Sequence, residues 1–93
     1  MIVEIVSPEA TLFKGEVVSV SVPGVNGEFQ MLNNHAPIVS LLTKGNIKLV
    51  GSKFVIEEGL VSKFKKIDNN TFWLPINSGT IELNDNKIII LAD

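Results

Sequence analysis

EVVSVSV, residues 16–22, alternates apolar and polar side chains more regularly than any other part of the chain. Successive side chains of a β-strand point to opposite faces of the sheet, so Val18, Val20 and Val22 are expected on one face and the serines between them on the other. Pro23-Gly24 follows and favours a type II turn, because Pro fixes φ at the second position and Gly supplies the positive φ at the third. The stretch therefore predicts a strand with one face in a hydrophobic core.

Short apolar segments recur along the whole chain, and each is ended by Gly, Pro, Asn or Asp. No window with the i, i+3, i+4 spacing of an amphipathic helix is long enough to predict one. About nine or ten short strands at this spacing predict an all-β fold, a β-sandwich or a flattened barrel rather than an open sheet. The segments with strand character cover residues 2–6, 11–13, 16–22, 29–32, 38–42, 46–49, 54–57, 63–67, 71–74, 80–83 and 87–91. The alternation predicts that Ile47, Leu49, Ile81 and Leu83 point inward.

The length allows one domain, because a chain of 93 residues can close a single hydrophobic core but cannot divide its apolar residues between two. We therefore expect one β-domain over residues 1–93. Within it, the strands at 54–57 and 63–67 are expected to be joined by a turn at Glu58-Gly59. The last hairpin is expected to turn at Asn84-Asp85-Asn86.

The charge pattern argues against nucleic acid as a partner. All eight basic residues are lysines and the net charge is −2, whereas phosphate backbones are bound by clustered positive charge, with Arg supplying bidentate contacts. Lys63, Lys65 and Lys66 form a basic cluster, and with Ser62 and Phe64 between them a solvated strand or turn is favoured over a polyanion site. The sequence therefore predicts no nucleic-acid binding.

The chain contains no cysteine, which excludes disulfides, thiolate metal sites and a cysteine nucleophile. The N-terminal residues show no basic region followed by a long apolar run, and Glu4 interrupts the first apolar residues. The longest uninterrupted apolar run, Ile88 to Ala92, is far shorter than the roughly 20 residues that span a bilayer. We therefore expect a soluble chain that is not exported.

Candidate catalytic groups are few. His35 is the only histidine, so a multi-histidine metal site is excluded, and neither Ser40 nor Asp68 stands in a catalytic pattern with it. A turn histidine that hydrogen-bonds backbone or a partner is favoured over a catalytic base. Gly24 and Gly27 are followed by an apolar segment, not by the helix N-terminus that a phosphate loop needs. The sequence predicts no catalytic residue, no cofactor and no metal, and hence no enzyme.

The apolar fraction, 45% of the residues, leaves two interpretations open. Either some apolar surface remains for a partner, or a tight β-core rich in Val and Ile absorbs it. A stand-alone β-sandwich module that binds a carbohydrate or peptide on an exposed aromatic such as Trp73 is the main alternative function. One Trp, five Phe and no Tyr supply such an aromatic platform thinly.

Several short motifs follow one another in a fixed order along the chain. They are Pro23-Gly24, Gly27-Glu28-Phe29, Asn34-His35-Ala36-Pro37 and Gly45-Asn46-Ile47-Lys48-Leu49, with Val6-Ser7-Pro8-Glu9 near the start and Leu91-Ala92-Asp93 at the end. No single motif is rare. In this order and spacing, however, they resemble the epsilon subunit of F-type ATP synthases.

The resemblance implies a ten-stranded β-sandwich in the central stalk of the synthase. It implies a non-catalytic subunit that binds the gamma subunit and the c-ring and helps couple ion translocation to ATP synthesis. Such a subunit lies peripherally on the cytoplasmic face of the bacterial inner membrane. The resemblance assigns the c-ring contact to Gly27, Glu28 and Phe29, and the gamma-subunit contact to Asn34, His35, Ala36 and Pro37.

The sequence departs from the family pattern in two places. Most members continue into a C-terminal helical hairpin that can inhibit ATP hydrolysis and in some members binds ATP, whereas the sequence stops at Asp93. We therefore expect no helical hairpin and carry over neither inhibition nor ATP binding. Residues 51–70 exceed the family's usual connection, so we expect an extended hairpin insert there. The family's Gly-Gly before the last hairpin is Ser78-Gly79.

Overall fold

The computed structural model describes residues 1–52 and 55–93, which form ten β-strands and one short 3₁₀ helix. The strands are β1 (Ile2–Val6), β2 (Thr11–Glu16), β3 (Ser19–Gly24), β4 (Gly27–Leu32), β5 (Ile38–Leu42), β6 (Gly45–Val50), β7 (Lys65–Asp68), β8 (Thr71–Ile76), β9 (Gly79–Asn84) and β10 (Lys87–Ala92). The helix, η1, covers Glu58–Lys63. The predicted all-β class is confirmed.

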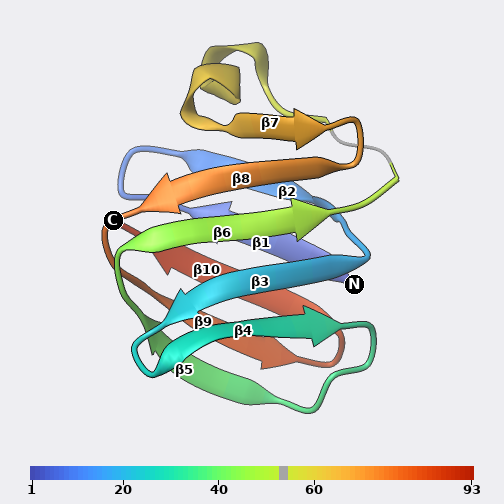
Figure 1. Cartoon of the computed structure of the whole chain (residues 1–93), viewed down its shortest axis with the longest axis vertical. Helices are drawn as coiled ribbons and strands as arrows, with labels where there is room; N and C mark the ends of the chain where they lie inside the picture. Colours follow the sequence, from blue (N-terminus) through green and yellow to red (C-terminus); the bar gives the residue numbers. More distant parts are fainter. Residues whose placement is uncertain (53–54) are drawn as a thin grey trace.

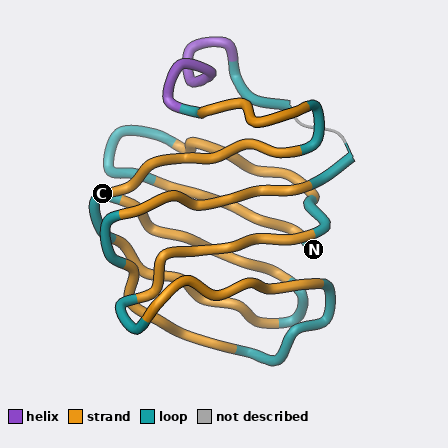
Figure 2. Tube along the Cα trace, in the orientation of Figure 1, coloured by secondary structure: helices purple, strands orange, loops and turns teal. Residues whose placement is uncertain are grey.

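The strands pair into two layers that face each other. One layer has the order β2-β1-β10-β9-β5, and the other has β3-β6-β8-β7 with β4 paired to the free side of β3. All pairs are antiparallel except β1 with β10. A single pair, Gly24 with Leu42, joins the layers, and Figures 1 and 2 show the second layer in front of the first. The predicted ten-stranded β-sandwich is confirmed.

The core lies between the layers and is built from alternate residues of the strands. In β6 and β9, Ile47, Leu49, Ile81 and Leu83 point inward, as the alternation predicts, and are almost fully buried. The largest fully buried side chains are Ile5, Met31, Ile47, Leu49, Ile81, Leu83, Ile88 and Ile90. Because every strand except β7 gives at least one buried residue, both layers depend on one core.

The continuous strand expected at 16–22 is divided in the structure. Glu16 ends β2 in one layer and Ser19 begins β3 in the other, so the chain crosses between layers at Val17 and Val18. The crossing breaks the period of two: Val17 is buried, whereas Val18 is 55% exposed. The prediction that Val18 shares the buried face of Val20 was therefore wrong.

The turn after this strand lies two residues later than predicted. Pro23 and Gly24 belong to β3, and Gly24 pairs with Gly27 across a two-residue loop. Gly27 takes the positive φ, 121°, so the type II turn at Pro23-Gly24 is incorrect. Gly24 serves a different purpose, because a Cβ there would lie 2.8 Å from both the Gly27 carbonyl oxygen and the Phe29 ring.

The segment 51–70 also differs from the prediction. The expected strand 54–57 begins at Phe54, outside the described residues, and residues 55–57 form no strand. Helix η1 occupies the expected turn, and the strand that follows, β7, pairs with β8. Ile56, Leu60 and Phe64 pack against the core, with the Phe64 ring centroid 6.4 Å from that of Phe13. Of these apolar residues only Leu60 lies in η1, whereas Ile56 precedes the helix and Phe64 directly follows it.

The C-terminal strand, β10, ends at Ala92. In residues 1–52 and 55–93 the structure contains no helical hairpin, in agreement with the prediction for this sequence. Within the same residues, no helix is long and apolar enough to cross a membrane.

Candidate subunit-docking surfaces

The turn that joins β3 and β4 carries the first group of predicted contact residues. Gly27 and Glu28 are exposed at the start of β4, whereas Phe29 is half-buried and packs against the core. Side chains alternate along β4, so Glu28 points out from the sheet and Phe29 points inward. Glu28 is therefore available at the surface, whereas Phe29 anchors the start of β4 to the core.

Glu28 has two neighbours on the outer face of its layer that the sequence reasoning missed. Its Oε1 lies 2.9 Å from Nζ of Lys48 on β6. The same Nζ lies 4.5 Å from the centroid of the Trp73 ring on β8, within the range of a cation–π contact. Since Lys48 covers a face of this ring, Trp73 is a poor platform for the sugar or peptide that a stand-alone binding module would take.

The second group of predicted contact residues, Asn34 to Pro37, lies in the loop between β4 and β5. All four residues are exposed. The His35 backbone N–H donates to the Leu32 carbonyl at 3.2 Å, and its Nδ1 lies 2.7 Å from the Ala36 carbonyl oxygen, which can only accept. Asn34 takes a positive φ of 63°, a backbone conformation that Asn tolerates well.

This loop is tied to a second turn far away in the sequence. The Asn34 backbone N–H donates to Oδ1 of Asn86, at 2.8 Å, in the turn between β9 and β10. The N-terminal amine of Met1 donates to Oδ1 of Asn33, also at 2.8 Å. The structure thus fixes the loop at both of its first residues, and no pattern in the sequence indicated Asn86 as its partner.

The two groups of predicted contact residues lie at opposite ends of β4. This strand runs from Gly27 to Leu32, and six residues of extended chain cover about 17 Å. Figure 1 shows the β3–β4 turn at the end of the sandwich that holds the C-terminus, and the β4–β5 loop at the end that holds the N-terminus. The structure therefore does not bring the groups together.

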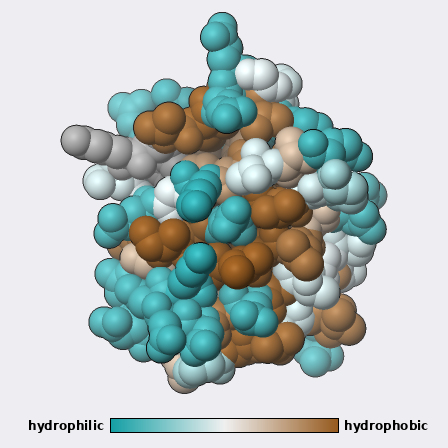
Figure 3. Space-filling model, turned by 180° about the vertical axis from the view of Figure 1, so that it is seen from behind, coloured by the Kyte–Doolittle hydropathy of each residue, from teal (hydrophilic) through white to brown (hydrophobic). Residues whose placement is uncertain are grey.

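The outer face of the β1-β10-β9-β5 layer exposes large apolar side chains. Val39 and Leu41 of β5 are 76% and 62% exposed, and Val25 and Leu91 are also exposed. Seen from behind, apolar residues gather across the middle of this face (Figure 3). We call Val25, Val39, Leu41 and Leu91 the apolar face. It answers the question that composition left open, because much apolar surface stays outside the core.

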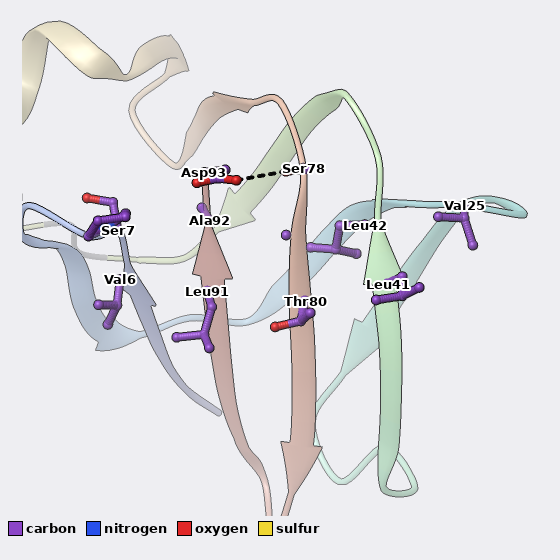
Figure 4. Close-up of a pocket in the computed structure, with 12 residues that line it drawn as sticks. Val6, Ser7, Val25, Leu41, Leu42, Ser78, Thr80, Leu91, Ala92 and Asp93 are labelled. Atoms are coloured by element: carbon purple, nitrogen blue, oxygen red, sulfur yellow. Dashed lines mark hydrogen bonds between the residues drawn. The ribbon is translucent and has the colours of Figure 1, made fainter.

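A groove of about 670 Å³ runs along part of the apolar face. Val6, Val25, Leu41 and Leu91 line it from four different segments, and the Ser78 hydroxyl donates to Oδ2 of Asp93 at 3.3 Å at its end (Figure 4). The lining is chiefly apolar. In residues 1–52 and 55–93 no three His, Cys, Asp or Glu side chains gather in a way that could hold a metal ion. The arrangement suits contact with another apolar surface.

Comparison with known proteins agrees with this architecture. The fold defines the class, a ten-stranded β-sandwich. Residues 1–63 match the family described as ATP synthase, Delta/Epsilon chain, beta-sandwich domain. The chain belongs to this family of ATP synthase delta and epsilon chains, as its motifs indicated.

Named relatives agree with the family. The ATP synthase epsilon chain of Leptospira borgpetersenii serovar Hardjo-bovis is 40% identical over 91 residues, which cover 98% of this chain and 59% of that protein. The ATP synthase epsilon chain of Chlorobaculum tepidum is 33% identical over 90 residues, which cover 97% of this chain and 85% of that protein. The chain spans about three fifths of the length of the first relatives.

Two solved structures share the fold. A chain of the Euglena gracilis mitochondrial ATP synthase, solved with OSCP, F1 and the c-ring, superimposes with a TM-score of 0.73 at 19% identity and is covered over 49% of its length. A chain of the central stalk and c-ring of the Tetrahymena thermophila mitochondrial ATP synthase gives 0.68 at 16% identity and is covered over 62%. In both comparisons 99% of this chain is matched.

Proposed function

We propose that the chain is the β-sandwich part of an epsilon subunit, which binds the gamma subunit and the c-ring in the central stalk of an F-type ATP synthase. In this role it couples ion translocation to ATP synthesis without catalysing a reaction. It lies peripherally on the cytoplasmic face of a bacterial inner membrane. The observation that carries the proposal is the apolar face, because a soluble monomer rarely leaves such residues uncovered.

The gamma subunit is the proposed occupant of the apolar face and of the Asn34–Pro37 loop. The loop leads directly into β5, the strand that carries Val39 and Leu41 of this face, whereas Leu91 belongs to β10 and Val25 lies between β3 and β4. Apolar area is the main source of binding energy between proteins that stay together, and exposed turns at its rim add orientation. Stable binding of gamma therefore requires both the apolar face and the Asn34–Pro37 loop.

The c-ring is the proposed partner of the β3–β4 turn. Glu28 offers a carboxylate on a short, well-supported turn, and the support comes from the buried Met31 and the half-buried Phe29 on the same strand. Torque can pass through the domain because both layers share one core and are hydrogen-bonded into a single curled sheet. A stiff domain with separate contacts at separate places suits a coupling role.

The experiment is co-purification of the chain with the gamma subunit from the same source. Val39→Asp places a charge on the apolar face and should abolish co-purification. The reason is that burying an unpaired carboxylate in the interface costs several kcal/mol of binding free energy. Val55→Asp is the matched control: Val55 is 85% exposed and precedes η1 in the sequence, and Figure 1 shows this helix at the opposite end of the molecule from β5. Co-purification of the Val39→Asp chain at the unmodified level would overturn the proposal.

A further inference from the structure

Lys48 forms the centre of a row of side chains that crosses one layer of the sandwich. It lies opposite Trp73 on β8 and opposite Ser21 on β3. Its Nζ contacts the Glu28 carboxylate, which belongs to β4, on the far side of β3. The row therefore joins strands β4, β6 and β8 by side chains alone, on the face that points away from the core.

The ion pair between Lys48 and Glu28 crosses β3, so it depends on the side chains that β3 carries on its outer face. Neighbouring strands lie about 4.8 Å apart and residues about 3.4 Å apart along a strand, so the side chains of Lys48 and Glu28, two strands and two residues apart, must together bridge about 12 Å. Ser21, the β3 residue opposite Lys48, is small, and Glu28 is opposite Pro23, two residues further along β3. The Lys48 side chain therefore crosses β3 on a diagonal to meet the carboxylate.

Trp73 reduces the freedom that Lys48 would otherwise have. A long exposed lysine loses much rotamer entropy when it forms an ion pair, and for this reason most surface pairs contribute little. Here the Nζ is held at once by the carboxylate at 2.9 Å and by the ring at 4.5 Å from its centroid. The Lys48 side chain is only 30% exposed, against 51% for Glu28. Ordering the Lys48 side chain thus costs rotamer entropy once, whereas it gains two favourable contacts.

We propose that Lys48 is a positioning residue, which orients the Glu28 carboxylate for contact with the c-ring, and that Trp73 holds Lys48 in place. The inference rests on the proposed function of Glu28. Lys48 occupies Oε1 of Glu28, and Oε2 is left to accept a hydrogen bond from a polar donor on a ring loop. Because the pair is neutral overall, the ring contact should depend on hydrogen bonding more than on net charge.

The first test measures the affinity of the gamma–chain complex for the purified c-ring. Lys48→Met should weaken binding about two- to fivefold, the range expected for loss of one partly exposed ion pair, and should make the affinity depend on salt. Lys48→Arg should restore most of the affinity, because the charge returns. Lys66→Met is the matched control, since Lys66 is exposed on β7 and its side chain has no ion-pair partner among the described residues.

A double variant separates positioning from an independent contact. If Lys48 acts through Glu28, Glu28→Ala with Lys48→Met should bind the c-ring no more weakly than Glu28→Ala alone. Additive losses in the double variant would show that Lys48 contacts the ring by itself and would overturn the inference. If Glu28→Ala weakens binding and Lys48→Met has no effect, the positioning role fails and the ring contact of Glu28 stands. If Glu28→Ala has no effect on c-ring binding, both the ring contact of Glu28 and the positioning role of Lys48 fail.

The second test is a spectroscopic signature in the full chain. The ε-methylene protons of Lys48 lie by the Trp73 ring and should resonate upfield of the other lysines. Trp73→Leu should remove this shift and weaken c-ring binding in the same direction as Lys48→Met, with an unchanged unfolding temperature as evidence that the fold persists. Ordinary lysine shifts for Lys48 in the unmodified chain would overturn the role of Trp73.

Discussion

At the scale of single residues, close approaches of backbone decide which glycines the fold requires. A Cβ at Gly79 would collide with the Leu91 carbonyl oxygen in the neighbouring strand, whereas a Cβ at Gly59 in η1 would meet nothing. Gly79 is also the residue kept from the Gly-Gly that the family carries before the last hairpin. Its role is therefore to let β9 and β10 approach.

Gly79→Ala should lower the free energy of unfolding by about 1–3 kcal/mol, because the obstacle is backbone and cannot rotate away. Gly59→Ala is the matched control and should leave stability unchanged or raise it by about 0.4–1 kcal/mol through reduced freedom of the unfolded chain. Chemical denaturation of the two variants beside the unmodified chain measures both. Equal stability of the Gly79→Ala and Gly59→Ala chains would contradict the prediction.

At the scale of elements, two turns from distant parts of the chain stabilise each other. Asp85 and Asn86 both take positive φ, 50° and 60°, in the last hairpin. Only Asn86 also accepts the Asn34 hydrogen bond, so the β9–β10 turn sets the position of the loop proposed to contact gamma.

Asn86→Gly keeps the backbone conformation and removes the side-chain acceptor, so it should loosen the Asn34–Pro37 loop while the hairpin persists. We expect faster amide exchange at Asn34 and up to about fivefold weaker binding of gamma, since one partly exposed hydrogen bond contributes about 0.5–1.5 kcal/mol. Asp85→Gly is the control, because it changes the same turn and leaves the acceptor in place. Identical exchange at Asn34 in both variants would refute this link.

At the scale of the whole molecule, the position of the proposed contacts at the two ends of β4 separates their functions. Glu28 and His35 are both exposed. Glu28 lies at the start of β4 and His35 in the loop that follows it, and Figure 1 shows the two ends of β4 at opposite ends of the sandwich. A rigid domain of this kind can present Glu28 to the ring at one end of β4 and the Asn34–Pro37 loop to gamma at the other. Changes at one end should then leave the other end unaffected.

Glu28→Ala should therefore leave gamma binding intact and lower the yield of ATP per translocated ion in the assembled synthase. The carboxylate is half exposed, so the loss at the ring contact should be at most about fivefold in affinity. His35→Ala should instead weaken gamma binding and spare the isolated ring contact. Co-purification with gamma and measurement of the coupling ratio test the two variants. If the Glu28→Ala synthase made as much ATP per translocated ion as the unmodified one, Glu28 would not be part of the ring contact.

The structure departs from the sequence-based predictions where tertiary contacts compete with local pattern. Val18 follows the alternation of its strand, yet the chain changes layer beside it and leaves it exposed. Pro23-Gly24 has turn composition, yet the Gly24 backbone is needed beside Phe29 and the turn forms after it. In residues 55–64, Ile56, Leu60 and Phe64 pack against the core although only Leu60 lies in a helix, η1.

The sequence by itself determined the all-β class, the inward faces of most strands and the family, because alternation and turn residues act locally and are visible in order along the chain. Only the tertiary structure decided that Lys48 meets Glu28 across β3, that Asn86 holds the β4–β5 loop and that Val39 and Leu41 remain uncovered. The physical reason is that alternation states which way a side chain points. Strand order and register decide which side chains it meets there.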